Sequence, residues 1–429
     1  MLTMLMVTVL ILFLLDVPVA FALALASLAF IALSGGALSL QVLPQKLASG
    51  ADSFPLLAVP FFILAGSLMN TGGITRRLVN LGQALVGHIR GGLAHVVVVT
   101  NMLMAGISGS ALADAVGTGA VLVPAMKKSG FSTPFSAAIT AAASTIGPII
   151  PPSIPFVVVG SVTGVSVGRL FLGGVIPGVF MGLFLMAFAY VISIRRNYPR
   201  DAWAGFRVIA LAFKDAVLAM LMPLIILGGI LGGAVTPTEA AVVAAVYAWV
   251  VGMFVYRELK LHHLPRILVE TTMTTASLLL IVSAASPFAV MLTWQGAAKL
   301  MTDWVMSLTQ NPFLVMMAIN VVLLILGCFM EGLSLIIILV PLLMPLVTAL
   351  GIDPVQFGVV FVLNIMIGGL TPPFGVIMFA MVALARTTIA EFSKECWPFI
   401  VALIMVLFLI TAVPPLVTWV PNALMGVSK

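Results

Sequence analysis

The sequence predicts an all-helical protein that crosses a membrane many times and contains two inverted structural repeats. Its 429 residues are 62% hydrophobic and only 7% charged, whereas a soluble domain has about 25% charged residues. The apolar residues fall in stretches of about 20, the length needed to cross a bilayer. Strings of Gly and Pro recur in both halves at a fixed spacing. A soluble enzyme, a disordered chain and a nucleic-acid-binding protein therefore fit this composition poorly.

The apolar stretches predict most of the spans directly. Seven have the length and composition of a spanning helix: 17–34, 55–72, 172–194, 217–234, 237–256, 267–293 and 398–420. The stretch 2–15 is shorter, and it fits either a separate short span or the first half of a bent helix. Basic and aromatic side chains in 195–214 predict a helix at the membrane surface. Thr236, Pro237 and Glu239 have the spacing of a capping box at a helix start.

Two regions are predicted to be re-entrant hairpins, entering and leaving the membrane on one side. The first covers about 91–127, with apolar arms on either side of Gly106-Ile-Ser-Gly-Ser110. Each arm has about 16 residues, which is roughly 24 Å of helix and short of a 30 Å hydrocarbon core. The Gly and Ser string is a poor helix interior and predicts the apex. The second hairpin covers about 312–348, with its apex at 327–332.

Each hairpin is followed by a helix that proline must interrupt. The first broken helix covers about 135–165 and contains Pro148 and Pro151-Pro152, and the second covers about 354–385 and contains Pro372-Pro373. Proline lacks the backbone N–H group and clashes with the preceding turn, so neither helix can continue intact. Inside a membrane, such non-helical backbone is tolerated only where protein buries it or a cavity wets it.

A shift of 221 residues aligns these features. Gly106 then aligns with Gly327, Gly147 with Gly368, and the first Pro-Pro pair with the second. The chain is therefore predicted to consist of two repeats, 1–215 and 216–429.

The distribution of basic residues predicts the orientation of these repeats. If the first hairpin opens to the cytoplasm and the second to the outside, 15 of the 19 Lys and Arg residues lie in cytoplasmic loops. The four outside are Lys46, Arg169, Lys299 and Lys429. This bias obeys the positive-inside rule. Equivalent hairpins then enter from opposite faces, an arrangement typical of secondary transporters.

This architecture predicts where an ion and an anionic substrate bind. Half-helix N-termini attract anions, and unwound carbonyl groups attract Na⁺. One predicted Na⁺ site combines Ser108, Gly109, Ser110, Ser144 and Gly147. Its counterpart combines Gly327, Glu331, Gly332, Gly368 and Thr371. The substrate is predicted between them, near Ser110, Asp114, Ser153, Thr371 and Pro372.

Other interpretations of these residues stay open. The glycines could serve close helix packing, and Asp114 and Glu331 could be structural rather than functional, although ionisable groups in apolar sequence are usually functional. The histidines lack metal-ligand spacing, so no transition-metal site is predicted. Neither a nucleophile elbow nor a P-loop is present, which argues against a hydrolase and an ATP-driven pump.

Longer strings resemble the large membrane subunit (DctM/SiaM type) of tripartite ATP-independent periplasmic (TRAP) transporters. Together they extend over nearly the whole chain. The matching strings are Pro60–Gly66, Asn70–Leu78, Gly106–Asp114, Ile146–Ser153, Gly233–Ala241 and Gly369–Gly375.

The resemblance implies Na⁺-driven uptake of an organic acid anion, such as sialic acid or a C4-dicarboxylate, across the bacterial inner membrane. It implies an elevator mechanism, in which a transport domain moves against a scaffold, and no organic cofactor. It also implies two protein partners besides membrane lipid: a small four-helix membrane subunit and a periplasmic substrate-binding protein. Arg169, on the predicted outer face, is a candidate docking residue.

The alternative is a stand-alone ion-coupled carboxylate transporter. A membrane-embedded enzyme is disfavoured, because only Asp114 and Glu331 are available for catalysis within the membrane.

Overall fold

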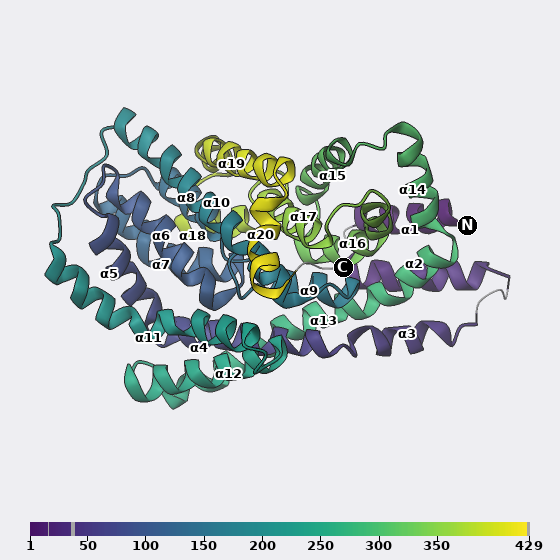
Figure 1. The fold of residues 1–429 in the computed structure, drawn as a ribbon, viewed down its shortest axis with the longest axis horizontal. Helices are drawn as coiled ribbons and strands as arrows, with labels where there is room; N and C mark the ends of the chain where they lie inside the picture. The colour runs from purple at the N-terminus through teal and green to yellow at the C-terminus, as the bar shows by residue number, and fades with distance from the viewer. Residues whose placement is uncertain (16, 36–38, 427–429) are drawn as a thin grey trace.

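The computed structural model describes residues 1–15, 17–35 and 39–426, and every regular element in these ranges is helical (Figure 1). Lys429 of the predicted topology lies outside the described residues. By length and composition, seven of the described helices could cross a membrane. The all-helical, multi-span class predicted from the sequence is therefore confirmed.

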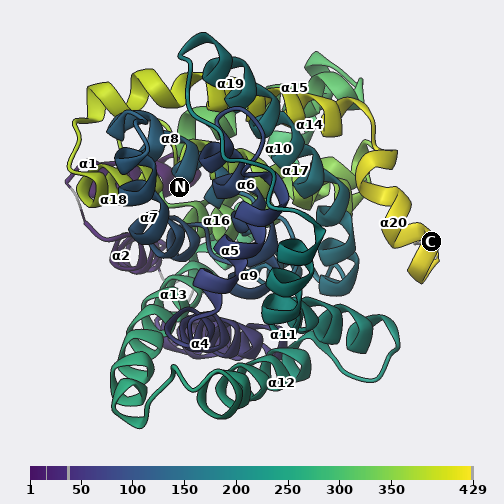
Figure 2. The ribbon, with the colours of Figure 1, turned by 90° about the vertical axis from the view of Figure 1, so that its left-hand side faces the viewer.

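Six helices form what we call the outer group. They are α2 (Val19–Leu33), α3 (Val42–Ala51), α4 (Ala58–Thr71), α11 (Phe206–Leu231), α12 (Pro237–Val250) and α13 (Leu264–Trp294). Helix α4 contacts α12 and α13, and α13 also contacts α2 and α3. In two views turned by 90°, α4, α12 and α13 lie together along the lower part of the molecule (Figures 1 and 2). The N-terminal stretch forms a separate helix, α1 (Leu2–Leu14), which contacts α2.

Eleven helices form what we call the hairpin group. From the first half come α6 (Gly92–Ser108), α7 (Ala111–Lys128), α8 (Thr133–Ser144), α9 (Ile154–Thr163) and α10 (Val167–Arg195). From the second half come α15 (Pro312–Gly327), α16 (Gly332–Ala349), α17 (Pro354–Gly368), α18 (Val376–Ala385), α19 (Ile389–Ala412) and α20 (Pro415–Met425). The two halves interlock, because α18 contacts α7 and α8, while α9 contacts α16 and α17.

The core of the hairpin group is helix α8. All of its residues from Phe135 to Ser144 are buried, and it contacts α6, α7, α10, α18 and α19. Alanine fills much of this helix, and small side chains allow close helix approach in a membrane protein. Two further helices connect the groups: α5 (Ile74–Val86) contacts α6 and α11, and α14 (Ala297–Leu308) contacts α13 and α16.

The helix boundaries differ from the predicted spans at several places. The span predicted at 398–420 is present with other bounds: α19 covers Ile389–Ala412, and α20 begins at Pro415. The Pro414-Pro415 pair interrupts the helical hydrogen bonds between them. The surface helix predicted at 195–214 is wrong: α10 continues to Arg195, and α11 begins at Phe206. Helix α2 has only 15 residues.

The capping box is confirmed. The Thr236 hydroxyl accepts a hydrogen bond from the Glu239 amide at 3.3 Å, and the Glu239 carboxylate accepts one from the Thr236 amide at 2.7 Å.

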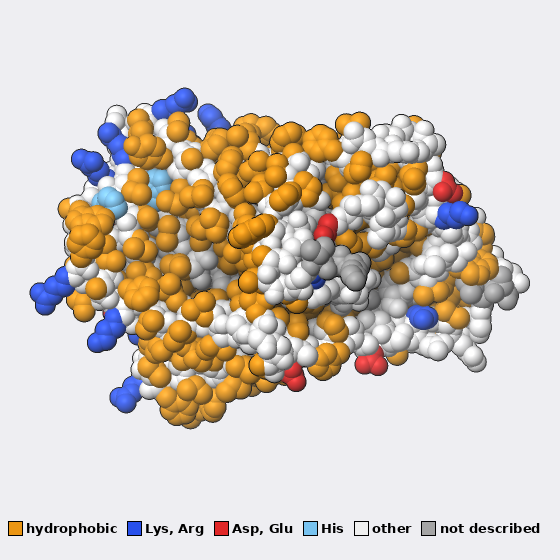
Figure 3. Space-filling model, in the orientation of Figure 1, with side chains coloured by type: hydrophobic (Ala, Val, Ile, Leu, Met, Phe, Trp, Pro, Cys, Tyr) orange, Lys and Arg blue, Asp and Glu red, His pale blue; other side chains and the backbone are white. Residues whose placement is uncertain are grey.

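Corresponding helices of the two halves lie at a constant spacing in the chain. Helix α7 covers 111–128 and α16 covers 332–349, which is the 221-residue shift of the sequence. With 18 residues, α16 is long enough to span a membrane, although the sequence assigned it to a hairpin arm. Lys and Arg side chains gather at the end of the molecule where α5 lies (Figure 3). The division into inverted repeats at 215/216 stays a prediction.

Candidate functional site

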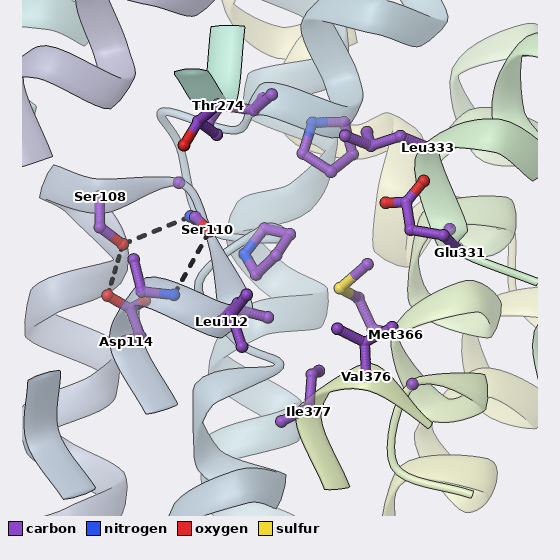
Figure 4. Close-up of a pocket in the computed structure, with 18 of the residues that line it drawn as sticks. Ser108, Ser110, Leu112, Asp114, Thr274, Glu331, Leu333, Met366, Val376 and Ile377 are labelled. Carbon is purple, nitrogen blue, oxygen red and sulfur yellow. Dashed lines mark hydrogen bonds between the residues drawn. The ribbon is translucent and has the colours of Figure 1, made fainter. Parts of the chain in front are cut away.

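A cavity of about 510 Å³ lies between the outer group and the two hairpins. Its walls come from α4 and α13, from the turns α6–α7 and α15–α16, and from both helix breaks. Figure 4 shows side chains from both hairpins facing this space. Small-molecule sites commonly have volumes of about 300–1,000 Å³, so the cavity fits a small organic ligand.

The first hairpin apex holds a hydrogen-bonded cluster at one side of the cavity (Figure 4). The Ser108 hydroxyl donates to Asp114 Oδ1, and the Ser110 amide donates to Ser108 Oγ at 3.4 Å. The Ser110 hydroxyl accepts a hydrogen bond from the Ala113 amide at 3.4 Å and so caps α7. Between them, Gly109 has φ +62°, a left-handed conformation that glycine adopts without steric cost. The N-terminus of α7 therefore lies at the cavity.

The second carboxylate oxygen of Asp114 has an unusual environment. The side chain is fully buried, and Oδ2 has no hydrogen-bond partner among the described residues. A methyl group at Gly147 would overlap Oδ2 and would lie 3.2 Å from the Ser144 carbonyl oxygen. Oδ2 thus lies beside the C-terminal end of α8, where carbonyl groups carry partial negative charge. An unpaired carboxylate oxygen next to the partial negative charge of a helix end suits a cation.

Two predicted site residues of the first half are engaged in local hydrogen bonds. The Ser144 hydroxyl donates to the Ala141 carbonyl at 2.8 Å. The Ser153 hydroxyl donates to the Pro148 carbonyl and accepts from the Phe156 amide, which caps α9. Neither residue is among those that line the cavity.

The second apex faces the first across the cavity. Gly327, Glu331 and Gly332 line the cavity. The sequence placed Glu331 deep in apolar surroundings, but the residue is exposed. Its carboxylate accepts hydrogen bonds from the amide and the hydroxyl of Ser334, at 3.1 and 3.2 Å, and so caps α16.

The other predicted residues of the second half lie away from the cavity lining. A methyl group at Gly368 would lie 2.6 Å from Gly327 Cα, so these glycines form a close crossing of α15 and α17. The Thr371 hydroxyl donates to the Ile367 carbonyl at 2.8 Å, and Pro372 is exposed. Close helix packing, the alternative interpretation of these glycines, therefore describes the Gly327–Gly368 pair.

Each hairpin apex contacts the helix break that follows it. In the first half, the Ile154 amide donates to the Gly109 carbonyl at 3.5 Å. In the second half, the Phe374 amide donates to the Cys328 carbonyl at 3.0 Å. These contacts hold the N-termini of α7, α9 and α16 around one space.

Sequence reasoning missed four polar residues of the cavity. Ser67 and Asn70 come from α4, and Glu270 and Thr274 come from α13. Glu270 carried a usable signal, since it is the one charged residue in the predicted span 267–293, and ionisable residues in spans are usually functional. The Arg266 guanidinium donates from Nε to Glu270 Oε1 at 2.7 Å.

The charge of the cavity wall is one-sided. Among the described residues that line it, Asp114, Glu270 and Glu331 are acidic, and none is Lys, Arg or His. Arg169 lies elsewhere, and its guanidinium donates to the Gly426 carbonyl and to Asn422 Oδ1, at 2.6 and 2.5 Å. An organic anion in the cavity would therefore depend on backbone N–H groups and on bound cations for its compensating charge.

Comparison with known proteins gives extended matches. The family model described as "Tripartite ATP-independent periplasmic transporter, DctM component" matches residues 6–416. The sialic acid TRAP transporter large permease protein SiaM of Vibrio cholerae is 40% identical over 412 residues, covering 96% of each chain. The C4-dicarboxylate TRAP transporter large permease protein DctM of Pseudomonas aeruginosa is 38% identical, covering 90% of each chain.

Solved structures are similar in fold. The YdaH transporter of Alcanivorax borkumensis superimposes with a TM-score of 0.67 at 15% identity, covering 93% of this chain and 97% of that one. MtrF of Neisseria gonorrhoeae superimposes with a TM-score of 0.59 at 12% identity, covering 89% and 85%. At these identities the likeness concerns the fold alone.

Proposed function

This chain belongs to the DctM family, the large permease subunits of TRAP transporters, and we propose that it takes up an organic acid anion together with Na⁺. Membership of this family makes it a multi-pass protein of the bacterial inner membrane and a transporter rather than an enzyme. The substrate, the coupling ion and the movement are the proposed parts.

The observation that carries the proposal is the acidic wall of a cavity shaped by both hairpins. Three carboxylates and no basic side chain line it within the described residues. An organic anion entering this space alone would meet repulsion, because opposite charges must accompany a buried charge. Na⁺ bound at the carboxylates would supply that charge and couple its own entry to that of the substrate.

The best Na⁺ site is formed by Asp114, Ser108 and the end of α8. Asp114 Oδ2 is buried and lacks a hydrogen-bond partner among the described residues, and Gly147 leaves space beside it. Discontinuous helices in transporters present their C-terminal carbonyls to Na⁺. The second site would use Gly327, Glu331 and Gly332. It lacks a counterpart of the Asp114 carboxylate, since position 335, at the 221-residue shift, is leucine.

The substrate carboxylate would lie between the N-termini of α7 and α16, near Ser110. Free N–H groups and the positive end of the helix dipole make such termini suitable for anions. Relatives are named for sialic acid, C4-dicarboxylates and 2,3-diketo-L-gulonate. These compounds share an acid group rather than a carbon skeleton, which agrees with a pocket that recognises the acid through backbone groups.

Movement and partners follow from the same assignment. The outer group would act as the scaffold and the hairpin group as the moving transport domain, with α5 and α14 as the connecting arms.

The tripartite family description supports a small four-helix membrane subunit and a periplasmic binding protein as partners. The SiaT permease of Haemophilus influenzae also supports the small subunit. This chain covers only 67% of that protein, and the remaining length has room for a fused small subunit. Docking at Arg169 stays a prediction.

Reconstitution tests the proposal. Proteoliposomes containing this chain with its membrane partner would be given labelled sialic acid or succinate, with or without the binding protein, under a Na⁺ or a K⁺ gradient. We expect uptake of an acid only with both Na⁺ and the binding protein. Uptake without the binding protein would favour the stand-alone alternative, and equal uptake in K⁺ would refute Na⁺ coupling.

A further inference from the structure

One face of α13 connects the cavity to the surface of the molecule. Glu270, Thr274 and Leu278 line the cavity, and their spacing of four residues places them on one face of the helix. Arg266 lies one turn before Glu270 and is paired with it. The Arg266 and Glu270 side chains are 84% and 55% exposed. The pair therefore lies at the mouth of the cavity.

This pair is poorly suited to stabilising the helix. Arg266 lies in the first turn of α13, where a cation opposes the helix dipole. Arg before Glu is the weaker order for a pair four residues apart, and exposed ion pairs contribute little to stability. A role at the cavity mouth therefore explains the Arg266–Glu270 pair better than a role in helix stability.

Arg266 has a direct consequence for the charge of this mouth. The cavity wall carries Asp114, Glu270 and Glu331 and no basic residue among the described lining residues. Glu270 and Glu331 are both exposed at the edge of this cavity. Arg266 pairs with Glu270 and neutralises its charge on the α13 side. Without Arg266, the mouth would select against anions.

We propose that Arg266 is a selectivity residue that makes the cavity mouth passable to organic anions by neutralising Glu270. In transport, which rests on the proposed function, this mouth would be the cytoplasmic exit, because α13 follows the basic segment 257–266 that the charge distribution assigns to the cytoplasm. The pair would then govern release of the anion after Na⁺ has left.

The proposal can be tested without substrate, binding protein or Na⁺ gradient. Ser67 lines the cavity on α4, and Ser67→Cys is nearly isosteric. In a Cys328→Ala background, the rate of modification of this thiol would be measured with a sulfonate-bearing and a trimethylammonium-bearing methanethiosulfonate. The complex with its membrane partner would be used, in low-salt buffer. Cys396 is fully buried and can remain.

We expect Arg266→Gln to lower the ratio of anionic to cationic modification rates by about three- to tenfold, as for one uncompensated charge acting through partly screened solvent. The double variant Arg266→Gln/Glu270→Gln should restore the ratio, and Arg266→Lys should retain it. Arg207→Gln, which removes an exposed charge on α11, should leave it unchanged. A thiol at Ser307, exposed on α14, controls for reagent reactivity.

An unchanged ratio in Arg266→Gln, or a ratio that the second substitution fails to restore, would overturn the proposal. If Arg266→Gln does not fold, Glu270→Gln decides instead: it leaves the charge of Arg266 unpaired, so the ratio should rise, and an unchanged ratio would overturn the proposal. The two proposals can fail separately. If the modification rates change as expected but the protein shows no Na⁺-dependent uptake, the proposed function is refuted and the role of Arg266 in selectivity is retained.

Discussion

Replacing Gly147 by alanine tests the proposed Na⁺ site most directly. The added methyl group would occupy the space beside Asp114 Oδ2, while Ser108 holds the other carboxylate oxygen. Asp114 is fully buried in α7, so the overlap has to be relieved by turning its short side chain. We expect the carboxylate to rotate out of place, which removes it as a Na⁺ ligand while its charge and its sequence position are retained.

The magnitude follows from linkage between binding and folding. Na⁺ at 100 times its dissociation constant stabilises the folded state by about 2.7 kcal/mol. Loss of one charged contact costs about 1.5–3 kcal/mol, which raises the dissociation constant at least about tenfold. At the same Na⁺ concentration, the stabilisation of the Gly147→Ala protein would then be at most about 1.4 kcal/mol. The Na⁺-specific gain in stability is therefore expected to fall by about half or more.

The assay is thermal unfolding of the purified protein in NaCl and in KCl at equal ionic strength. Gly228→Ala is the matched control, because Gly228 lies within α11 and has no atom within 4 Å of an added methyl group. Wild type and Gly228→Ala should show the same Na⁺-specific rise in melting temperature, and Gly147→Ala a smaller one. A full Na⁺ response in Gly147→Ala would refute the assignment of Asp114 Oδ2.

Three further substitutions have defined outcomes. Ser108→Ala removes the hydroxyl that orients Asp114, so the Na⁺ concentration for half-maximal uptake should rise several-fold, and an unchanged Na⁺ curve would contradict the apex assignment. Gly368→Ala forces apart the backbone crossing with Gly327 and should cost about 1–3 kcal/mol in denaturant unfolding, whereas Gly228→Ala should be nearly neutral. Thr236→Ala removes the capping-box hydroxyl of α12 and should cost about 1 kcal/mol by the same measurement, with no change in Na⁺ dependence.

Local composition determined much of the architecture. Apolar length fixed the number and approximate position of most spans, because a bilayer core of about 30 Å imposes that length. Proline and glycine strings located the apices and the helix breaks, since these residues act on the backbone wherever they lie. The Thr236 capping box is another local pattern that the structure confirms. The predicted boundaries failed near 195–214, where the local signal was weak, and at 398–420, where the Pro414-Pro415 pair was a usable signal that the prediction passed over.

The side-chain environments needed the tertiary structure. Asp114 and Glu331 looked alike in sequence, as lone acids in apolar surroundings. The fold buries Asp114 against the end of α8 and leaves Glu331 exposed as a helix cap. Asp114 lies in the first turn of α7, which packs against α8, whereas Glu331 is the cap residue of α16. The burial of Asp114 therefore depends on how two helices pack in the fold.

The sequence by itself determined that this protein is a membrane transporter of one family, with two hairpin apices and two broken helices. Only the tertiary structure decided that α4 and α13 complete the cavity, and that Glu270 with Arg266 lies at its mouth. The physical reason is the distance along the chain over which each effect acts. Propensity, hydropathy and proline chemistry act within a few residues, whereas a cavity and its charge are set by helices brought together from distant parts of the chain.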